Sequence, residues 1–308
     1  MIYTITFNPA VDMVYQLDQL VEGGLNRSAE ESYVAGGKGV NASILLRRLG
    51  HENRATGFLG GFTGQFIKDE LQAEGIDPYF IEVDGFTRIN AKINTRQATA
   101  TEVNGEGPQI PQAKRAELAA FFQQELQAGD VVFLMGNKAP GMTADDFKQI
   151  ADICLDKGAR FVLDTNRDLL RACLASKPFI IKPNNEELSE IFNVKIESVE
   201  DIIYYAKKLQ EEGAENVLVS LGAKGALLVA ANGEVYQSDV PNGQVVNPTG
   251  AGDSMLAGFM AKYLETEDYA QSLQQGAASG SATTYSAGIA TADKVYALYQ
   301  EINVKEIK

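Results

Sequence analysis

The sequence predicts an α/β protein in which a mainly parallel central sheet carries helices on both faces. Short apolar runs rich in β-branched residues alternate with segments of helical spacing along most of the 308-residue chain. Parallel strands need such crossovers, because consecutive strands must start from the same edge of the sheet. Hydrophobic residues make up 45% of the chain and charged residues 22%, which is typical of a globular domain.

Five apolar runs read as buried strands: residues 2–7, 131–136, 160–165, 179–184 and 216–222. Helical spacing with charged outer faces marks residues 112–128, 144–157 and 198–212. Several strands end in polar or glycine-rich text, namely "FNPAVD", "DTNRD", "KPNNEE" and "SLGAKG". Ligands of open α/β sheets bind at the carboxyl ends of the strands, so we expect the chemistry there.

Two excursions interrupt the alternation of strands and helices. Residues 12–34 lack a clear helix, and residues 88–104 open with strict alternation in "INAKIN", where Ile89, Ala91 and Ile93 share one face. Such alternation predicts an antiparallel strand with one wet face. We expect both excursions to build a small separate sheet, acting as a lid with its polar face toward the cleft or as a dimer surface. The rest of residues 1–308 is expected to form one domain.

Composition excludes several classes of protein. With 27 basic and 41 acidic residues the net charge is −14, which disfavours binding to nucleic acid or to anionic membranes. Cys154 and Cys173 fit no disulfide or zinc pattern. No apolar run approaches ~18 residues, and the first residues lack the basic region of a signal peptide. We therefore expect a cytoplasmic protein.

The segment "VVNPTGAGDSMLAGFMAKYL" (residues 245–264) combines a glycine turn with an amphipathic helix. The start of a helix offers unpaired N–H groups and the positive end of the helix dipole. Gly250, Ala251 and Gly252 could therefore hold a phosphoryl group, and Asp253 could accept a proton from an attacking hydroxyl. The alternative is that Asp253 only caps the helix. No Walker A loop occurs in the chain.

Two further motifs fit ligands near this turn. In "AGGKGVNAS" (residues 35–43), Gly36 and Gly37 allow close backbone approach, Lys38 could meet a phosphate, and Asn41 could bind sugar hydroxyls. A flexible loop is the alternative. Near the N-terminus Asp12 is either a sugar ligand or a turn residue.

In "IIKPNNEEL" (residues 180–188), Lys182 suits nucleotide phosphates, while Asn184 and Glu187 share one helix face and suit water-mediated Mg²⁺. Helix capping by Asn184 and Glu187 is the alternative. "VSLGAKGALLV" (residues 219–229) could pass close to a nucleotide or could be a plain hairpin. His51, the only histidine, is expected on the surface, so no histidine-based catalysis is predicted.

The motifs "NPAVD", "GGKGVN", "KPNNEE", "SLGAKG" and "TGAGDS" follow one order over almost the whole chain. This set resembles the PfkB family of ribokinase-like sugar kinases. The resemblance implies a three-layer α/β/α domain with a β lid that often builds a homodimer. It also implies ATP-dependent phosphorylation of a phosphorylated ketohexose. Fructose 1-phosphate, phosphorylated at C6, is the expected substrate, with tagatose 6-phosphate or a 6-phosphofructokinase activity as alternatives. A silent sugar-phosphate sensor is a different class, which the intact "TGAGD" argues against.

The resemblance also assigns roles to single residues. It makes Asp253 the catalytic base and the backbone of residues 250–252 the anion hole. Sugar hydroxyls would be held by Asp12, Gly36, Gly37 and Asn41, and the sugar phosphate by Arg27, Lys38 and Arg88. ATP phosphates and water-bound Mg²⁺ would lie at Lys182, Asn184 and Glu187. The nucleotide would be bordered by Ser220, Gly222, Gly225, Thr249, Ala277 and Ser281.

Some members bind a monovalent cation near the strand before "TGAGD" and near "YSAGIA" (residues 285–290), which makes K⁺ a further candidate ligand. The chain departs from the family pattern at two places. Asn137 stands where a serine that often touches the sugar is usual, and Arg96 stands where glycine is common. The identity of the sugar is therefore the least determined part of the prediction.

Overall fold

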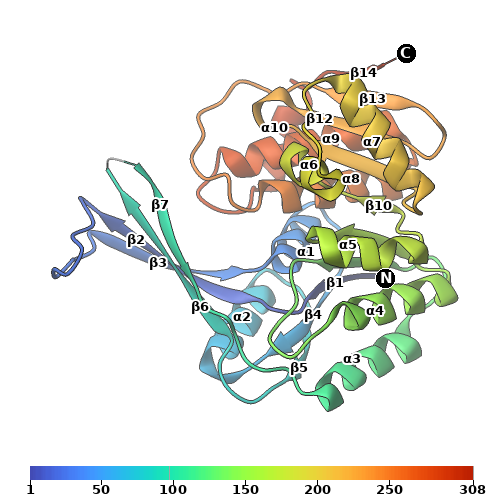
Figure 1. Cartoon of the computed structure of the whole chain (residues 1–308). Coiled ribbons are helices and arrows are strands. Elements are labelled where there is room, and N and C mark those ends of the chain that lie inside the picture. The colour runs from blue at the N-terminus through green and yellow to red at the C-terminus, as the bar shows by residue number, and fades with distance from the viewer. Residues whose placement is uncertain (97, 308) are drawn as a thin grey trace.

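A ten-stranded sheet forms the middle layer of the structure, a computed structural model that describes residues 1–96 and 98–307 (Figure 1). Its order is β14-β13-β12-β11-β10-β9-β8-β1-β4-β5. Neighbouring strands in the part β11-β10-β9-β8-β1-β4-β5 of this order pair in parallel. The remaining strands β12, β13 and β14 add an antiparallel edge. The bounds are β1 Ile2–Thr6, β4 Arg54–Leu59, β5 Tyr79–Glu82, β8 Val131–Met135, β9 Arg160–Asp164, β10 Ile180–Ile181, β11 Asn216–Ser220, β12 Ala226–Val229, β13 Val235–Ser238 and β14 Val304–Glu306.

Helices cover both faces of this sheet. One apolar cluster joins the sheet to α3 Gln112–Glu125, α4 Ala144–Lys157, α5 Arg167–Cys173, α6 Asn185–Phe192 and α7 Val199–Glu211. A second cluster on the opposite face joins it to α1 Lys38–Arg48, α8 Ala251–Thr266, α9 Tyr269–Thr284 and α10 Ala292–Tyr299. Three layers are the result, as the sequence predicted. Short 3₁₀ turns occupy Leu174–Ser176 and Gly222–Lys224.

The second sheet has the order β3-β2-β6-β7, with β2 Ala10–Leu17, β3 Glu30–Gly36, β6 Arg88–Thr95 and β7 Ala98–Asn104. Its arms extend away from the main body in Figure 1. The expected excursions at residues 12–34 and 88–104 are therefore confirmed as a sheet. The alternating residues 89–94 lie in a strand, β6, as expected, but the segment 88–104 also contains a second strand, β7, which the pattern did not predict. Moreover, β6 runs parallel to β2 and antiparallel to β7.

The base of the small sheet is fixed to the main body by a third apolar cluster. Val11 and Ala35 of the small sheet pack there with Ile67 and Leu71 of α2 Gly61–Ala73. This shared core fits a single domain over residues 1–308, which stays a prediction. Arg96, which follows the end of β6, pairs with Asp18 at 2.8 Å. No helix in the described part of the chain is long and apolar enough to cross a membrane.

Close packing of two helices positions the glycine turn of the site. A side chain at Gly258 on α8 would come within 2.1 Å of Ser279 on α9, and one at Gly280 would come within 3.1 Å of the Ala251 carbonyl oxygen. The absence of these side chains lets α8 and α9 approach closely along their length. The start of α8 is therefore held by buried packing rather than by a surface loop.

Candidate active site

A cleft of about 990 Å³ opens at the carboxyl ends of the central strands, next to the small sheet. Its lining includes most of the residues that the sequence singled out: Asp12, Gly37, Lys38, Asn41, Arg88, Lys182, Asn184, Glu187, Ser220, Thr249, Gly250, Gly252 and Asp253. These residues come from six separate parts of the chain. Their convergence confirms that the edge chosen from the sequence is where the polar groups gather.

The glycine turn begins α8 without help from a capping side chain. Gly250 is the N-cap residue with a left-handed φ of 80°, and a side chain there would collide with Ile289. A side chain at Gly252 would come within 2.9 Å of the Lys182 ammonium nitrogen. Among the described residues, no acceptor bonds to the backbone N–H groups of Gly252 and Asp253. The turn can therefore present free N–H groups to an anion.

Asp253 is not the helix cap, so the capping alternative is wrong for this residue. Its side chain is 6% exposed, and its Oδ2 accepts a hydrogen bond of 2.8 Å from Asn41 Nδ2. Burial, followed by the nearby charge of Asp164, raises the pKa of Asp253 to about 6. The Lys38 charge and the Asn41 hydrogen bond oppose this rise. A carboxylate with this pKa is a stronger base than an exposed aspartate, yet it is ionised at neutral pH.

Asp164 is a central residue that we did not select from the sequence. It is 2% exposed, and its carboxylate lies 2.9 Å from the Lys38 ammonium and 3.4 Å from that of Lys182. Burial alone would raise the pKa of Asp164, but the two lysines outweigh burial and lower it. The polar ending "DTNRD" of its strand was the available indication. Asp164 therefore holds two lysines of the cleft in fixed positions.

The small sheet presents its polar face to the cleft, as expected. Asp12 accepts a hydrogen bond of 2.8 Å from Asn90 Nδ2, and it forms an ion pair of 2.9 Å with Lys92. A side chain at Gly36 would lie 3.0 Å from the Asp12 carboxylate, so Gly36 makes room for it. Asn90 lines the cleft and was not among the predicted site residues. The register of β2 with β6 brings Asp12 and Asn90 side by side.

Of the three residues expected around a sugar phosphate, Arg88 and Lys38 line the cleft and Arg27 does not. Burial lowers the pKa of Arg88, whose Nε donates to the Asn8 carbonyl at 3.1 Å. Arg27 is exposed in the connection between β2 and β3. Lys38 is bound to Asp164 rather than free. Within a single chain, Arg88 is thus the member of this set that faces the cleft without a carboxylate bonded to it.

Asn184 and Glu187 form a reciprocal capping box at the start of α6. Glu187 N–H donates to Asn184 Oδ1 at 2.7 Å, and Asn184 N–H donates to Glu187 Oε2 at 2.8 Å. The capping alternative is therefore confirmed, but both side chains also line the cleft. Glu187 keeps Oε1 for a metal-bound water. No group of three or more acidic, histidine or cysteine side chains that could ligate a metal directly occurs in the described residues, so water-mediated Mg²⁺ fits this donor set better.

The residues expected to border the nucleotide fall into two groups in the structure. Ser220 and Thr249 line the cleft, and Gly222 and Gly225 shape the β11–β12 hairpin with left-handed φ angles of 57° and 87°. Ala277 is 2% exposed in the apolar cluster between α9 and the sheet, and Ser281 is 9% exposed. Neither lines the cleft of the described structure. Their small side chains serve helix packing, and the placement of both beside the nucleotide stays a prediction.

The loop of residues 285–290 is held by side-chain donors. The Tyr285 carbonyl accepts from Lys294, and the Ala287 carbonyl accepts from Asn247 Nδ2 at 3.0 Å. The Ile289 and Ala290 carbonyls accept from Arg48. A monovalent cation would need such carbonyl oxygens as ligands. Four carbonyls of this loop therefore already accept hydrogen bonds, and K⁺ would have to share these oxygens with the side-chain donors.

These groups define a class of protein. A buried base, a helix start that can hold an anion, and two fixed lysines at one edge of a parallel sheet are the parts that phosphoryl transfer to an alcohol requires. Comparison with known sequences narrows the class further. The chain matches the pfkB family carbohydrate kinase profile over residues 5–294, and it belongs to that family.

Individual relatives agree with this assignment. The chain is 42% identical to the 1-phosphofructokinase of Bacillus subtilis and 37% identical to the D-tagatose-1-phosphate kinase of Bacillus licheniformis, each over the full length of both proteins. The crystal structure of Escherichia coli phosphofructokinase-2 with substrates and products superposes with a TM-score of 0.92 at 26% identity, covering 97% of this chain and 98% of that one. The same enzyme has been solved in complex with potassium, with a TM-score of 0.90. The fold is thus ribokinase-like, and the protein is a phosphotransferase.

Proposed function

We propose that the protein transfers the γ-phosphoryl group of ATP to the C6 hydroxyl of fructose 1-phosphate. The observation that carries the proposal is Asp253, buried beside free backbone N–H groups with a pKa of about 6. Both curated relatives are named for ketohexose phosphates, and the tagatose enzyme is named for a 1-phosphate. A phosphate at C1 leaves C6 as the terminal hydroxyl. These names therefore favour a ketohexose 1-phosphate over tagatose 6-phosphate.

The chain's own residues divide the work along the cleft. Asp12, held by Asn90 and Lys92, is placed to accept hydrogen bonds from sugar hydroxyls. Arg88 supplies positive charge for the phosphate that stays on the sugar. Asp253 takes the proton of the attacking hydroxyl, and the amides after Gly250 hold the oxygens that gain charge as the phosphoryl group moves.

The nucleotide side of the proposed site is built by Lys182, Ser220 and the start of α6. Lys182, which Asp164 holds beside Gly252, would contact ATP phosphates. Asn184 and Glu187 would hold Mg²⁺ through water, and the metal would neutralise phosphate charge when it is bound. In this arrangement Lys38 would face the transferred group rather than the sugar phosphate, because Asp164 holds its ammonium and the nearby charge of Asp253 also raises the pKa of Lys38.

We further propose that two chains pair through the small sheet. Tyr33, Ile89 and Val103 are 48%, 38% and 61% exposed, and the strand register places them on the face that turns away from Asp12. A four-stranded sheet with one bare apolar face gains stability by covering that face. A cytoplasmic location, where ATP is available, completes the proposal.

A coupled ATP-consumption assay tests the substrate. The panel holds fructose 1-phosphate, tagatose 1-phosphate, tagatose 6-phosphate and fructose 6-phosphate. We expect the highest kcat/KM with fructose 1-phosphate, followed by tagatose 1-phosphate, which differs from it at a single carbon. A preference for either 6-phosphate would overturn the C1 assignment. Absence of turnover with every sugar, while ATP still binds, would favour the silent sensor.

A further inference from the structure

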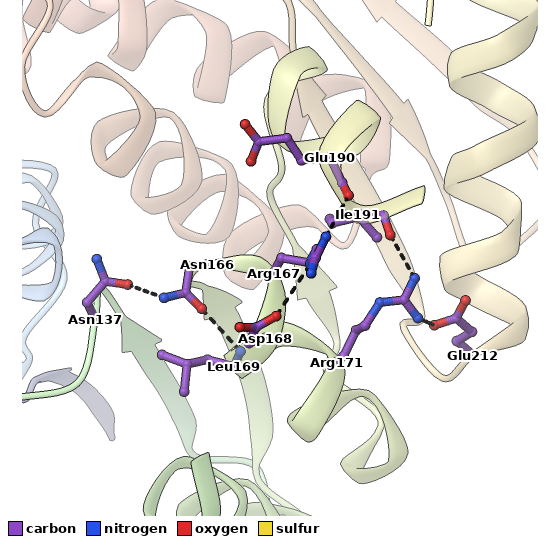
Figure 2. A network of polar contacts seen from close by, with 9 residues as sticks. All are labelled: Asn137, Asn166, Arg167, Asp168, Leu169, Arg171, Glu190, Ile191 and Glu212. Carbon is purple, nitrogen blue, oxygen red and sulfur yellow. Dashed lines mark hydrogen bonds and ion pairs between the residues drawn. The ribbon is translucent and has the colours of Figure 1, made fainter. Parts of the chain in front are cut away.

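Asn137 lies on the cleft, in the loop after β8, beside the start of α5 (Figure 2). Asn166 Nδ2 donates to Asn137 Oδ1 at 2.9 Å. Both side chains are amides, and an amide turned by 180° exchanges its donor and its acceptor. The polarity that Asn137 shows to a substrate therefore depends on a third group that can only donate.

The backbone N–H of Leu169 is that group. It donates to Asn166 Oδ1 at 3.2 Å, because Asn166 is the N-cap residue of α5. With its oxygen used, Asn166 can offer Asn137 only its Nδ2. Asn137 must therefore accept this hydrogen bond with its Oδ1. Its own Nδ2, which carries two N–H groups, is left to donate into the cleft.

The chain of hydrogen bonds from Leu169 through Asn166 to Asn137 is called the relay here. The helix that carries its fixed end, α5, is attached to the neighbouring helix α6. Arg167 Nη1 donates to the Glu190 carbonyl at 3.2 Å, and Arg171 Nη2 donates to the Ile191 carbonyl at 2.9 Å, both at the end of α6 (Figure 2). Arg171 also pairs with Glu212 at 3.0 Å. These contacts hold α5, and with it the cap residue Asn166, against α6 and α7.

Two cationic side chains share the cleft with Asn137. Lys138 follows it in the chain and lines the same cleft, as does Arg88. The loop is tied to the segment that holds Arg88, because Ile110 N–H donates to the Pro140 carbonyl at 2.9 Å and Arg88 Nη1 lies 3.4 Å from the Gly105 carbonyl. Donors and cations together favour an anionic oxygen as the partner of Asn137.

We propose that Asn166 is a positioning residue that fixes the polarity of Asn137, so that Asn137 donates to the phosphate that stays on the sugar. The inference rests on the proposed function for the identity of that phosphate. It assigns a role in substrate selection to the N-cap residue of α5, which does not itself line the cleft.

The variant Asn166→Asp tests the relay. A carboxylate still accepts from Leu169 N–H and caps α5 as well as asparagine does, but it cannot donate. Asn137 then turns its Nδ2 toward α5 and its Oδ1 toward the cleft. We expect KM for the sugar phosphate to rise about tenfold, the usual effect of one lost hydrogen bond that becomes repulsive. KM for ATP, kcat and the thermal midpoint should stay unchanged.

Added charge alone could repel a phosphate, so the control is a double-mutant cycle with Asn137→Ala. In that background Asn166→Asp has no amide to turn, and it should change KM for the sugar phosphate little. An equal rise in both backgrounds would mean that charge acts by itself and would overturn the relay. An unchanged KM in Asn166→Asp would overturn it as well.

The same variants separate this inference from the proposed function. KM is measured with whichever ketohexose phosphate the wild type turns over fastest, so a preference for another sugar contradicts the substrate assignment and leaves the cycle readable. If the wild type turns over none of them, inorganic phosphate is the probe. Inorganic phosphate should then raise the thermal midpoint of Asn166→Asp less than that of the wild type. It should raise the midpoints of Asn137→Ala and of the double variant by equal amounts.

Discussion

The Lys38 ammonium lies 2.9 Å from Asp164 Oδ1, in a pair whose carboxylate is almost fully buried. Lys182 faces the other oxygen of the same carboxylate at 3.4 Å. One buried anion therefore fixes two cations, and its charge also contributes to the raised pKa of Asp253. The base and the phosphate-binding lysines are thus electrostatically linked, and the predictions on pH and stability follow from this link.

Replacing the base Asp253 should slow phosphoryl transfer strongly without preventing ligand binding. In Asp253→Asn we expect kcat to fall by roughly 10²–10⁴, the usual contribution of general-base catalysis. ATP binding should persist, because Lys182 and Ser220 are untouched. In the wild type, kcat/KM should rise with pH through about 6, since the base acts only when it is ionised. A variant with wild-type kcat would remove Asp253 from the mechanism.

The same substitution should stabilise the fold above the pKa of the base. The folded pKa of Asp253, about 6, lies above its ordinary value of 3.8, so the folded state binds the proton more tightly than the unfolded state. Folding therefore loses stability as pH rises from about 4 to 6, and the loss is complete above that window. Asp253→Asn avoids this cost, and we expect it to be more stable by about 1–3 kcal/mol at pH 8. Denaturant unfolding at pH 5 and 8 measures the difference, which should shrink at the lower pH.

Asp164→Asn should act on both stability and pH dependence. Lys182, which is 6% exposed, would lose its buried partner, and breaking such a pair costs about 3–5 kcal/mol. One charge that raises the pKa of Asp253 would also disappear, so the acid limb of kcat/KM should move to lower pH. Glu82→Gln breaks the pair with Lys68, in which Glu82 is 79% exposed, and it is the matched control that should leave stability nearly unchanged. An unmoved acid limb in Asp164→Asn would contradict the link.

The sequence predicted the edge of the sheet and most of the cleft, because those predictions depended on local patterns. The glycine turn before Asp253 and the alternation in residues 89–94 can be read without knowing what lies opposite. Asp164 and Asn90 could not be selected in this way, since their roles come from partners about 126 and 78 positions away in the chain.

Ala277 shows a different limit of the sequence. The family resemblance implies that this residue borders the nucleotide, which stays a prediction, and in the structure the alanine packs in the apolar cluster that joins α9 to the sheet. Small residues on α9 have a packing role that the sequence does not distinguish from close approach to a ligand. The division of residues 88–104 into two strands was missed for a related reason, because β7 is defined by its pairing with β6 rather than by its own pattern.

Potassium should be dispensable for this enzyme. Lys294 donates to the Tyr285 carbonyl and lies 3.0 Å from Ser286 Oγ, while Asn247 and Arg48 occupy the next carbonyls of the loop. We expect equal kcat with K⁺ or tetramethylammonium as the only monovalent cation, and no K⁺-dependent rise of the thermal midpoint. Lys294→Met should lower kcat and the midpoint, and K⁺ should restore part of both. Lys262→Met, on the neighbouring helix, is the control. A wild type that requires K⁺ would show that the loop opens for the ion.

The last prediction concerns the bare face of the small sheet. If two chains pair through Tyr33, Ile89 and Val103, then Ile89→Glu combined with Val103→Glu should give monomers in sedimentation experiments, because buried like charges repel across the interface. Tyr204→Glu on α7 is the control, since Tyr204 is 56% exposed and lies outside the small sheet.

Loss of the pairing should also reach the cleft. Asn90 and Lys92 hold Asp12 from the opposite face of β6, so a sheet that loses its support should hold the sugar ligand less precisely. We expect KM for the sugar phosphate to rise and KM for ATP to change little, with more ATP hydrolysed per sugar phosphorylated because water enters the cleft. A double variant that is monomeric but keeps the wild-type KM and the wild-type ratio of ATP hydrolysed to sugar phosphorylated would contradict this expectation. It would show that the small sheet holds Asp12 in place without a second chain. A wild type that is monomeric and fully active at micromolar concentration would refute the dimer itself.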